Sequence, residues 1–346
     1  MLSTFVISKF VMRKKLLLLL LTVSSVAFGQ DKKFLNPQLK FSAEYLPSSD
    51  LKDVADESFS YGKAQLGLVY PLISRRFSLT NDLEYKAFAV LINANGTYAL
   101  PDYSFLNTTH QLISAVAGPS IIYNTGNKNT WLAGFTVGMA QDLELLSQTQ
   151  IRFTGHALFK HKVSGNFSYH LGVVYSFVYG QPLPLPLIGC VVRTSNKSKL
   201  KISLPLSVAF YYKTNAYDML SLFIQPDGDQ YNFSAIGDTV FAGRDPLALR
   251  MRYRSFKSGL SYKIGVNDRW FITPEVGLSL ARKITFTEGS ITDKKTFISA
   301  DVKPGPYVKL GVRFLLGDLK WKRTGDNFLL NDERLDYYDL DDPTKL

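Results

Sequence analysis

The chain has 346 residues, of which 46% are hydrophobic, 20% charged and 13% aromatic, and its formal net charge is +11. A chain this rich in apolar and aromatic residues is neither intrinsically disordered nor collagen-like. The single cysteine, Cys190, excludes an internal disulfide framework and a multi-cysteine zinc site, and four histidines leave little material for histidine-based metal clusters.

Residues 1–29 predict a secretory signal peptide. A positive segment (Arg13–Lys15) precedes an apolar stretch (Leu16–Phe28), and small residues lie just before Gln30. Such a stretch is too short for a membrane-spanning helix and is typical of an export signal. Because its four cations would leave with it, we expect a mature net charge of +7.

The remainder of the chain alternates with a period of two. In residues 167–180 the odd positions are large and apolar, whereas most even positions are small or polar. Successive side chains of a strand point to opposite faces, so this pattern predicts strands with one apolar face. The same alternation recurs at 63–70, 79–87, 131–140, 199–212, 270–280 and 308–316.

The length of these runs favours a membrane barrel over a secreted soluble β-sandwich, which stays open as an alternative. The runs exceed the average soluble strand of about 5–6 residues and suit a tilted bilayer-spanning strand of about 9–11. Only a closed barrel satisfies every backbone group in lipid with strands. Aromatic residues near the ends of the runs, where an interfacial girdle is expected, include Tyr70, Tyr123, Trp131, Tyr179 and Trp270.

The expected connections differ in length, and the length of the alternating region predicts the strand number. Short polar turns are expected at 124–127, 162–165, 195–198, 225–229 and 265–268, and longer connections at about 47–59, 92–108, 213–220, 237–247 and 283–300. This contrast is typical of a barrel with short periplasmic turns and long external loops. The 279 residues from Gln38 to Leu316, at roughly 22 residues per strand and connection, give about 12–13 strands. We therefore expect an all-β, transmembrane, antiparallel up-and-down β-barrel of about 12 strands, within a range of 10–14, because bacterial barrels take even numbers.

Three segments follow from this division. The export signal covers 1–29, the barrel 30–320 and an acidic periplasmic tail 321–346. From Thr324 to Leu346 seven acids face two bases, so this part carries −5 and residues 30–323 carry +12. The tail is a free end, a docking peptide for a periplasmic protein, or a plug for a basic lumen.

Residues 180–190 read GQPLPLPLIGC. Pro182, Pro184 and Pro186 share one parity, so three backbone donors toward one neighbouring strand are missing. Either this strand boundary is weakly paired and can open sideways, or the prolines lie in a turn at the rim. The sequence leaves both interpretations open.

The order of several motifs resembles a known family. The signal ending in AFGQ, the GQPLPLPLIG segment, the strand Lys201–Leu206, then QPDGDQYNF and SGLSYKI resemble an uncharacterised family of Bacteroidota outer-membrane β-barrels, a domain of unknown function. The resemblance covers residues 30–320 and implies an outer-membrane barrel. It transfers no substrate and no catalytic residue.

No motif for catalysis, metal or cofactor binding stands out. His110 and Ser114 share a strand face without an acid at a suitable spacing, and His156 shares its face with cations, which disfavour a general base. Asp227–Asp229 lacks the terminal glutamate of a calcium loop and favours a turn. We therefore expect no enzyme, with a lipid-modifying enzyme using a rim histidine as the alternative.

The polar strand face carries the candidate functional residues. The lumen-facing candidates are Arg250, Arg252, Arg254, Lys86, Asp82, Glu84, Arg152 and Lys160. Either these charges pair and fill a narrow barrel, because unpaired buried charge is costly, or surplus cations line a water-filled path for anions.

The sequence predicts a location and a set of partners more clearly than an activity. We expect a protein of the cell outer membrane, in contact with outer-membrane lipids and without a nucleic-acid partner. Its role is then the passage of small anionic solutes, or a structural or interaction role in the envelope. The sequence does not indicate an oligomeric state.

Overall fold

The computed structural model describes residues 35, 37–52, 56–79, 84–106, 110–125, 128–148, 150–215, 218–234, 239–241, 249–267, 269–289 and 294–316. The predicted export signal and acidic tail lie outside these residues.

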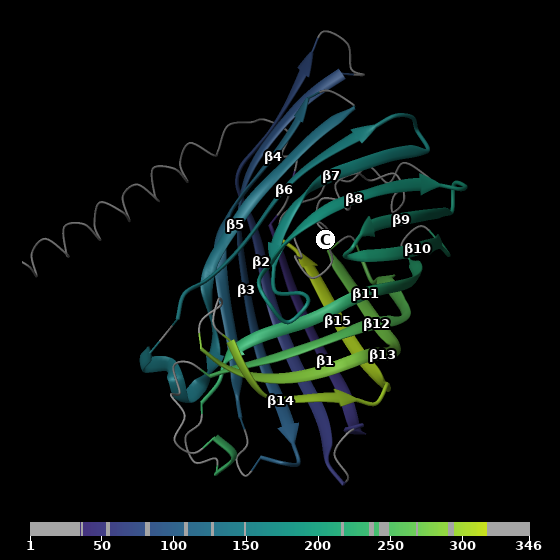
Figure 1. The fold of residues 1–346 in the computed structure, drawn as a ribbon. Coiled ribbons are helices and arrows are strands. Elements are labelled where there is room, and N and C mark those ends of the chain that lie inside the picture. The colour runs from purple at the N-terminus through teal and green to yellow at the C-terminus, as the bar shows by residue number, and fades with distance from the viewer. Residues whose placement is uncertain are drawn as a thin grey trace, which may run out of the picture.

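A single antiparallel sheet closes on itself into a barrel (Figure 1). Its strands are β1 (Gln38–Asp50), β2 (Ser58–Leu79), β3 (Glu84–Tyr103), β4 (Leu112–Thr125), β5 (Asn129–Asp142), β6 (Arg152–Lys162), β7 (Phe167–Ser176), β8 (Leu183–Arg193), β9 (Ser198–Leu204), β10 (Ser207–Lys213), β11 (Met219–Asn232), β12 (Arg250–Gly265), β13 (Trp270–Gly289), β14 (Lys294–Val302) and β15 (Gly305–Leu315). Two short 3₁₀ helices, η1 (Leu143–Gln148) and η2 (Thr239–Phe241), lie between strands.

The ring contains 14 of these strands. Neighbours in sequence pair from β1 to β13, and β15 pairs with both β13 and β1, which closes the barrel. Among the described strands β14 pairs with β13 at one end of the sheet order and stays outside the ring. The antiparallel up-and-down barrel is thus confirmed, the expected 12 strands were two too few, and the alternative of a β-sandwich is wrong.

The two rims differ in their connections. At the rim where β1 begins and β15 ends, which we call the turn rim, the connections have five residues or fewer: 80–83, 126–128, 163–166, 194–197, 214–218 and 266–269. The opposite loop rim has the connections 51–57, 104–111, 143–151, 177–182, 205–206 and 233–249. Four of the predicted short turns therefore lie on one rim. Residues 225–229 are not a turn but part of β11, and 214–218 is short rather than long.

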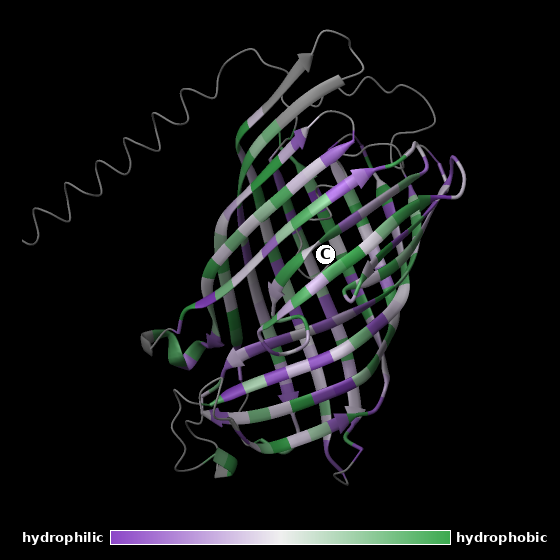
Figure 2. Cartoon of the chain, turned by 45° about the horizontal axis from the view of Figure 1, so that its top comes forward, coloured by the Kyte–Doolittle hydropathy of each residue, from purple (hydrophilic) through white to green (hydrophobic). Residues whose placement is uncertain are grey.

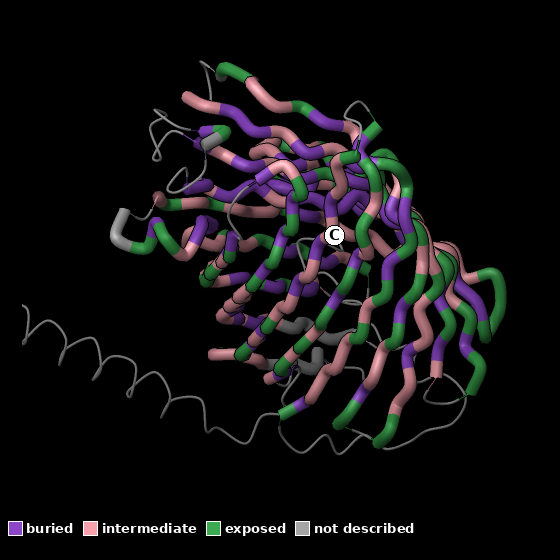
Figure 3. Tube along the Cα trace, turned by 90° about the horizontal axis from the view of Figure 1, so that it is seen from below, coloured by how far each residue is buried: buried purple, intermediate pink, exposed green. Residues whose placement is uncertain are grey.

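The barrel wall has an apolar outside. In β7 the side chains of Phe167, Leu171 and Val173 are exposed, whereas their neighbours Ser168 and His170 are buried. The alternation of hydrophobic with hydrophilic residues runs along most strands (Figure 2), as does that of buried with exposed residues (Figure 3). The period-two pattern thus places an apolar belt on the outer face. In the described residues no helix is long and apolar enough to cross a membrane.

Aromatic side chains fill the loop-rim end of the lumen. The rings of Phe233 and Phe286 lie 5.0 Å apart, and that of Tyr103 lies 5.5 Å from Phe286. Phe59 and Tyr61 continue this cluster from β2 with less than 2% of their surface exposed. Rings at these separations pack as in a protein core, so this end of the barrel is filled rather than open.

Candidate functional site

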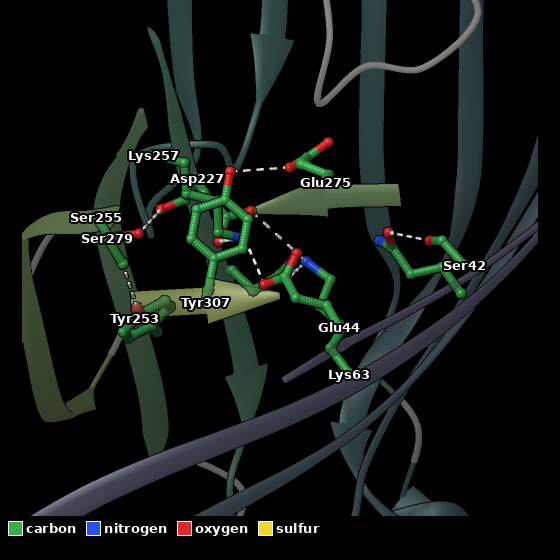
Figure 4. Close-up of polar contacts among 12 residues, drawn as sticks. Ser42, Glu44, Lys63, Asp227, Tyr253, Ser255, Lys257, Glu275, Ser279 and Tyr307 are labelled. Carbon is green, nitrogen blue, oxygen red and sulfur yellow. Dashed lines mark hydrogen bonds and ion pairs between the residues drawn. The ribbon is translucent and has the colours of Figure 1, made fainter. Parts of the chain in front are cut away.

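A cluster of buried and partly buried charges lies in the lumen, and Figure 4 shows four of its members, Glu44, Lys63, Asp227 and Lys257. We call it the charge cluster, and it consists of Glu44, Lys63, Arg152, Asp227, Asp229 and Lys257. Lys257 Nζ lies 2.5 Å from Glu44 Oε1 and 2.8 Å from Asp227 Oδ2. Lys63 Nζ lies 3.1 Å from Asp229 Oδ2 and 3.7 Å from Asp227 Oδ1.

Apart from Lys257–Asp227, which joins the neighbouring strands β12 and β11, these ion pairs join strands that are not neighbours in the sheet. Lys63 on β2 reaches the carboxylates of β11, and Lys257 on β12 reaches Glu44 on β1. Because the partners lie on separated parts of the wall, their side chains bridge the lumen. The cluster contains three acids and three bases, which offset the cost of burying each charge.

The sheet register extends this cluster along the wall. Lys63 is opposite Glu44, Glu44 is opposite Lys309, and Lys309 is opposite Glu275, so charges of alternating sign follow one another across four strands. Tyr307 Oη donates a hydrogen bond of 2.9 Å to Glu275 Oε1. Opposite charges on directly paired residues stabilise a sheet, so this row also holds the strands in register.

Cations predominate on the turn-rim side of the charge cluster. Two cavities of about 180 Å³ and 100 Å³ lie there and share Thr273, Glu275 and Arg313 in their walls. Together we call them the cationic chamber. Its charged lining consists of the bases Lys40, Arg152, Lys201, Lys263, Lys309 and Arg313 and the acids Asp229 and Glu275. Six bases against two acids give the chamber a positive potential, which favours anions.

The predicted lumen residues fall into three groups. Arg152 lines the larger cavity, 4.0 Å from Asp229, and Lys160 lies on the same face of β6. Glu84 and Lys86 belong to β3, but their side chains, like Asp82 as a whole, lie outside the described part of the structure.

Arg250, Arg252 and Arg254 do not line the lumen. Their side chains point to the same side of β12 as the exposed Phe256, which is the outer face, whereas the side chain of Tyr253 is buried inside. The reason is an inversion of polarity near the loop rim. There the barrel is filled by aromatic side chains, so the apolar residues of this alternating segment point inward and the arginines outward.

A buried pair of a histidine and an aspartate at the loop rim was not predicted. His110 Nδ1 lies 2.7 Å from Asp142 Oδ2, and the imidazole centroid is 4.0 Å from the ring of Phe233. Both side chains of the pair are 2% exposed, so solvent does not reach the imidazole in this structure. Among the described residues no group of three or more His, Cys, Asp or Glu side chains is arranged to hold a metal ion.

Sequence reasoning missed most of the charge cluster as a site. Parity indicates that Lys63 and Lys257 point inward, but a period-two pattern does not show which strands face each other across a lumen. Asp227 and Asp229 were hidden by the turn signal Pro-Asp-Gly. The available signal was a pair of acids on one strand face, Asp227 and Asp229, together with two lysines that point inward, Lys63 and Lys257.

Comparisons with known proteins give a family and similar folds. Residues 33–315 match the family described as Domain of unknown function (DUF6268), and no curated protein matches the sequence. The fold is similar to that of the COG4313 outer membrane channel from Pseudomonas putida F1, with 8% identity, a TM-score of 0.42 and coverage of 83% of this chain and 98% of that chain.

Two further solved structures are similar at lower scores. The translocator domain of the autotransporter NalP from Neisseria meningitidis has 10% identity, a TM-score of 0.37 and coverage of 89% of this chain and 96% of that chain. The Pseudomonas putida toluene transporter TodX has 9% identity, a TM-score of 0.31 and coverage of 84% and 91%.

Proposed function

The chain belongs to this family of unknown function, and we propose from its geometry that it is an outer-membrane barrel that takes small anionic solutes into its cationic chamber. The observation that carries the proposal is the excess of six bases over two acids around the two cavities. A positive, partly enclosed site concentrates small anions and disfavours small cations.

The outer face supports a place in a membrane. Large apolar side chains are exposed around the ring, including Phe41, Leu66, Phe135 and Leu222, each at about half of its surface. Soluble proteins rarely expose so continuous an apolar surface, whereas a bilayer covers it. Trp131 and Trp270 lie next to the turn rim, where an interfacial girdle is expected.

The lumen determines how such a solute would move. The charge cluster and the aromatic cluster close the loop-rim side of the chamber, so a solute that crosses the barrel has to displace them. We therefore expect brief openings rather than a large steady conductance. Exchange with the chamber from the turn-rim side does not require either cluster to move.

A salt-gradient measurement in planar bilayers tests the proposal. The reconstituted full chain should prefer chloride over potassium, and the double variant Lys201→Glu, Lys263→Glu should lose this preference. Each charge reversal in a hydrated chamber is worth about 1–2 kcal/mol, which corresponds to a roughly five- to thirtyfold change in relative occupancy.

Arg252→Glu combined with Arg254→Glu is the matched control, because it also reverses two positive charges, on the outer face of β12. It should leave the ion preference unchanged. Equal reversal potentials for the wild type and the double variant, or a complete lack of current, would contradict the anion assignment.

A further inference from the structure

The barrel wall has a gap in its hydrogen-bonding ladder between β8 and β11. Pairing of β8 with β9 begins only at Ile188, and pairing of β10 with β11 extends only from Met219 to Ile224. Leu183–Leu187 and most of Gln225–Asn232 therefore have no paired strand on the sides that face each other. The hairpin of β9 and β10, seven residues in each strand, is too short to bridge them (Figure 1).

Two prolines on the edge of β8 prevent another strand from pairing with it. Pro184 and Pro186 lie within this strand, pair with Tyr175 and Val173 of β7, and are exposed on the outer face. Proline has no backbone donor, and natural edge strands use it to prevent pairing with another strand. Of the two interpretations that the sequence leaves open, the structure favours a seam in the wall for Pro184 and Pro186, whereas Pro182 lies in the connection.

The connection 177–182, which runs from β7 to β8, covers this seam between β8 and β11. Val178 is 4% exposed, and Tyr179 Oη donates a hydrogen bond of 2.7 Å to the carbonyl of Pro205 in the hairpin. The connection lies so close to β11 that a Cβ at Gly228 would meet Val178 O at 2.6 Å and Gly180 N at 2.8 Å. The closure thus depends on packing against a glycine.

The surface changes from apolar to cationic across the seam. Outside, Ile188 and Leu204 are exposed; inside, Leu187 and Leu206 form part of a buried apolar cluster. Behind them lies the smaller cavity of the chamber. Its lining includes Ser207 and Gln225, which lie where the pairing of β10 with β11 ends, and three cations, Lys201, Lys263 and Arg313.

We propose that this seam is a lateral binding and access site for an amphipathic anion, with the apolar chain at the seam and the anionic head among the cations of the smaller cavity. The proposal rests on the proposed membrane location and extends the proposed solute class to molecules with an apolar chain and a carboxylate or phosphate head. The connection 177–182 is the part that moves aside, because it is held by packing and side-chain contacts instead of a strand ladder.

Photolabelling from the lipid phase tests this site. The full chain is reconstituted in vesicles with dodecanoic acid that bears a diazirine at its chain end, and adducts are mapped by mass spectrometry. We expect adducts enriched in residues 177–187 over the belt segment 39–45 of β1. Lys201→Glu with Lys263→Glu should reduce this enrichment by roughly fivefold or more for the acid, and not for the matched neutral dodecanol probe.

Two variants test the closure. Gly228→Ala should push the connection away and increase labelling at 177–182, and Gly165→Ala, whose added Cβ meets nothing within 4 Å, is the matched control. Tyr179→Phe removes only the hydrogen bond to Pro205 and should act in the same direction if Gly228→Ala fails to fold.

The outcomes separate this site from the proposed function. Adducts spread evenly over the belt would overturn the seam, and equal enrichment with the neutral probe would overturn the cationic end of the site. Enrichment at 177–187 without any anion preference in the salt-gradient measurement would leave the lateral site standing and refute the passage of small anions.

Discussion

Removing one cation from the charge cluster should cost far more than removing one from the surface. Lys257 is 2% exposed and Glu44 4%, and Lys257 Nζ contacts both Glu44 and Asp227. Lys257→Met keeps most of the side-chain volume but leaves two carboxylates without their shared partner. Breaking a buried ion pair on one side costs about 3–5 kcal/mol, and we expect a loss of stability in that range.

The matched control removes a lysine from an exposed pair. Lys303 Nζ lies 2.9 Å from Asp50 Oδ2, but the two side chains are 57% and 69% exposed. Lys303→Met should therefore cost about 0–1 kcal/mol. Urea unfolding in vesicles, followed by tryptophan fluorescence, measures both changes.

Two further comparisons test whether the charge cluster is buried. Adding Glu44→Gln and Asp227→Asn to Lys257→Met should recover part of the loss, because the unpaired charges are then gone. Equal, small costs for Lys257→Met and Lys303→Met would refute the closed lumen, since the charge cluster would then have to be hydrated.

Three further predictions concern the loop rim, the tail and the membrane. Phe286→Ala should lower stability by about 3–5 kcal/mol in the same urea assay, because its ring packs 5.0 Å from that of Phe233; a cost below that of Leu278→Ala on the outer face would contradict a packed end. Deleting residues 324–346, which carry −5, should raise the bilayer conductance if they occupy the cationic chamber, and an unchanged current would assign them to a partner or a free end. In a Trp321→Phe background, lipids brominated near the head group should quench Trp131 and Trp270 more than lipids brominated at the chain end, and no quenching by either would contradict the membrane location.

The alternation of side chains predicted the wall but not the number of strands. Residues 199–212 form one continuous alternating pattern, yet the structure divides them into β9 and β10. Ser203 pairs with Ser207, so residues of equal parity keep the same face on both sides of the turn at Pro205. A hairpin of this kind leaves no break in a period-two pattern, so the sequence shows one run where the structure has two strands. Strands of seven residues also shorten the average spacing, so a count from chain length comes out too low.

Residues 225–229 were predicted as a turn but form part of a strand, because tertiary contacts outweigh the local preference for a turn. Pro-Asp-Gly favours a turn in isolation, yet these residues extend β11 and pair with β12 from Lys257 to Tyr253. Asp227 forms ion pairs with Lys63 across the lumen and with Lys257 on the neighbouring strand β12, and Gly228 lets the connection 177–182 approach closely. These contacts join residues that lie far apart in the sequence, so the sequence alone could not show that 225–229 forms a strand.

The closed loop-rim end and the seam in the wall lead to one physical consequence for any solute in the chamber. A hydrated anion cannot follow the apolar seam, because it would lose its water without gaining a polar partner. It therefore has to use the turn rim or displace the charge cluster. An amphipathic anion can leave its apolar chain in the belt while its head contacts Lys201 or Lys263, so the seam costs it little desolvation. The chemistry of the solute, rather than the width of the barrel, decides which path it takes.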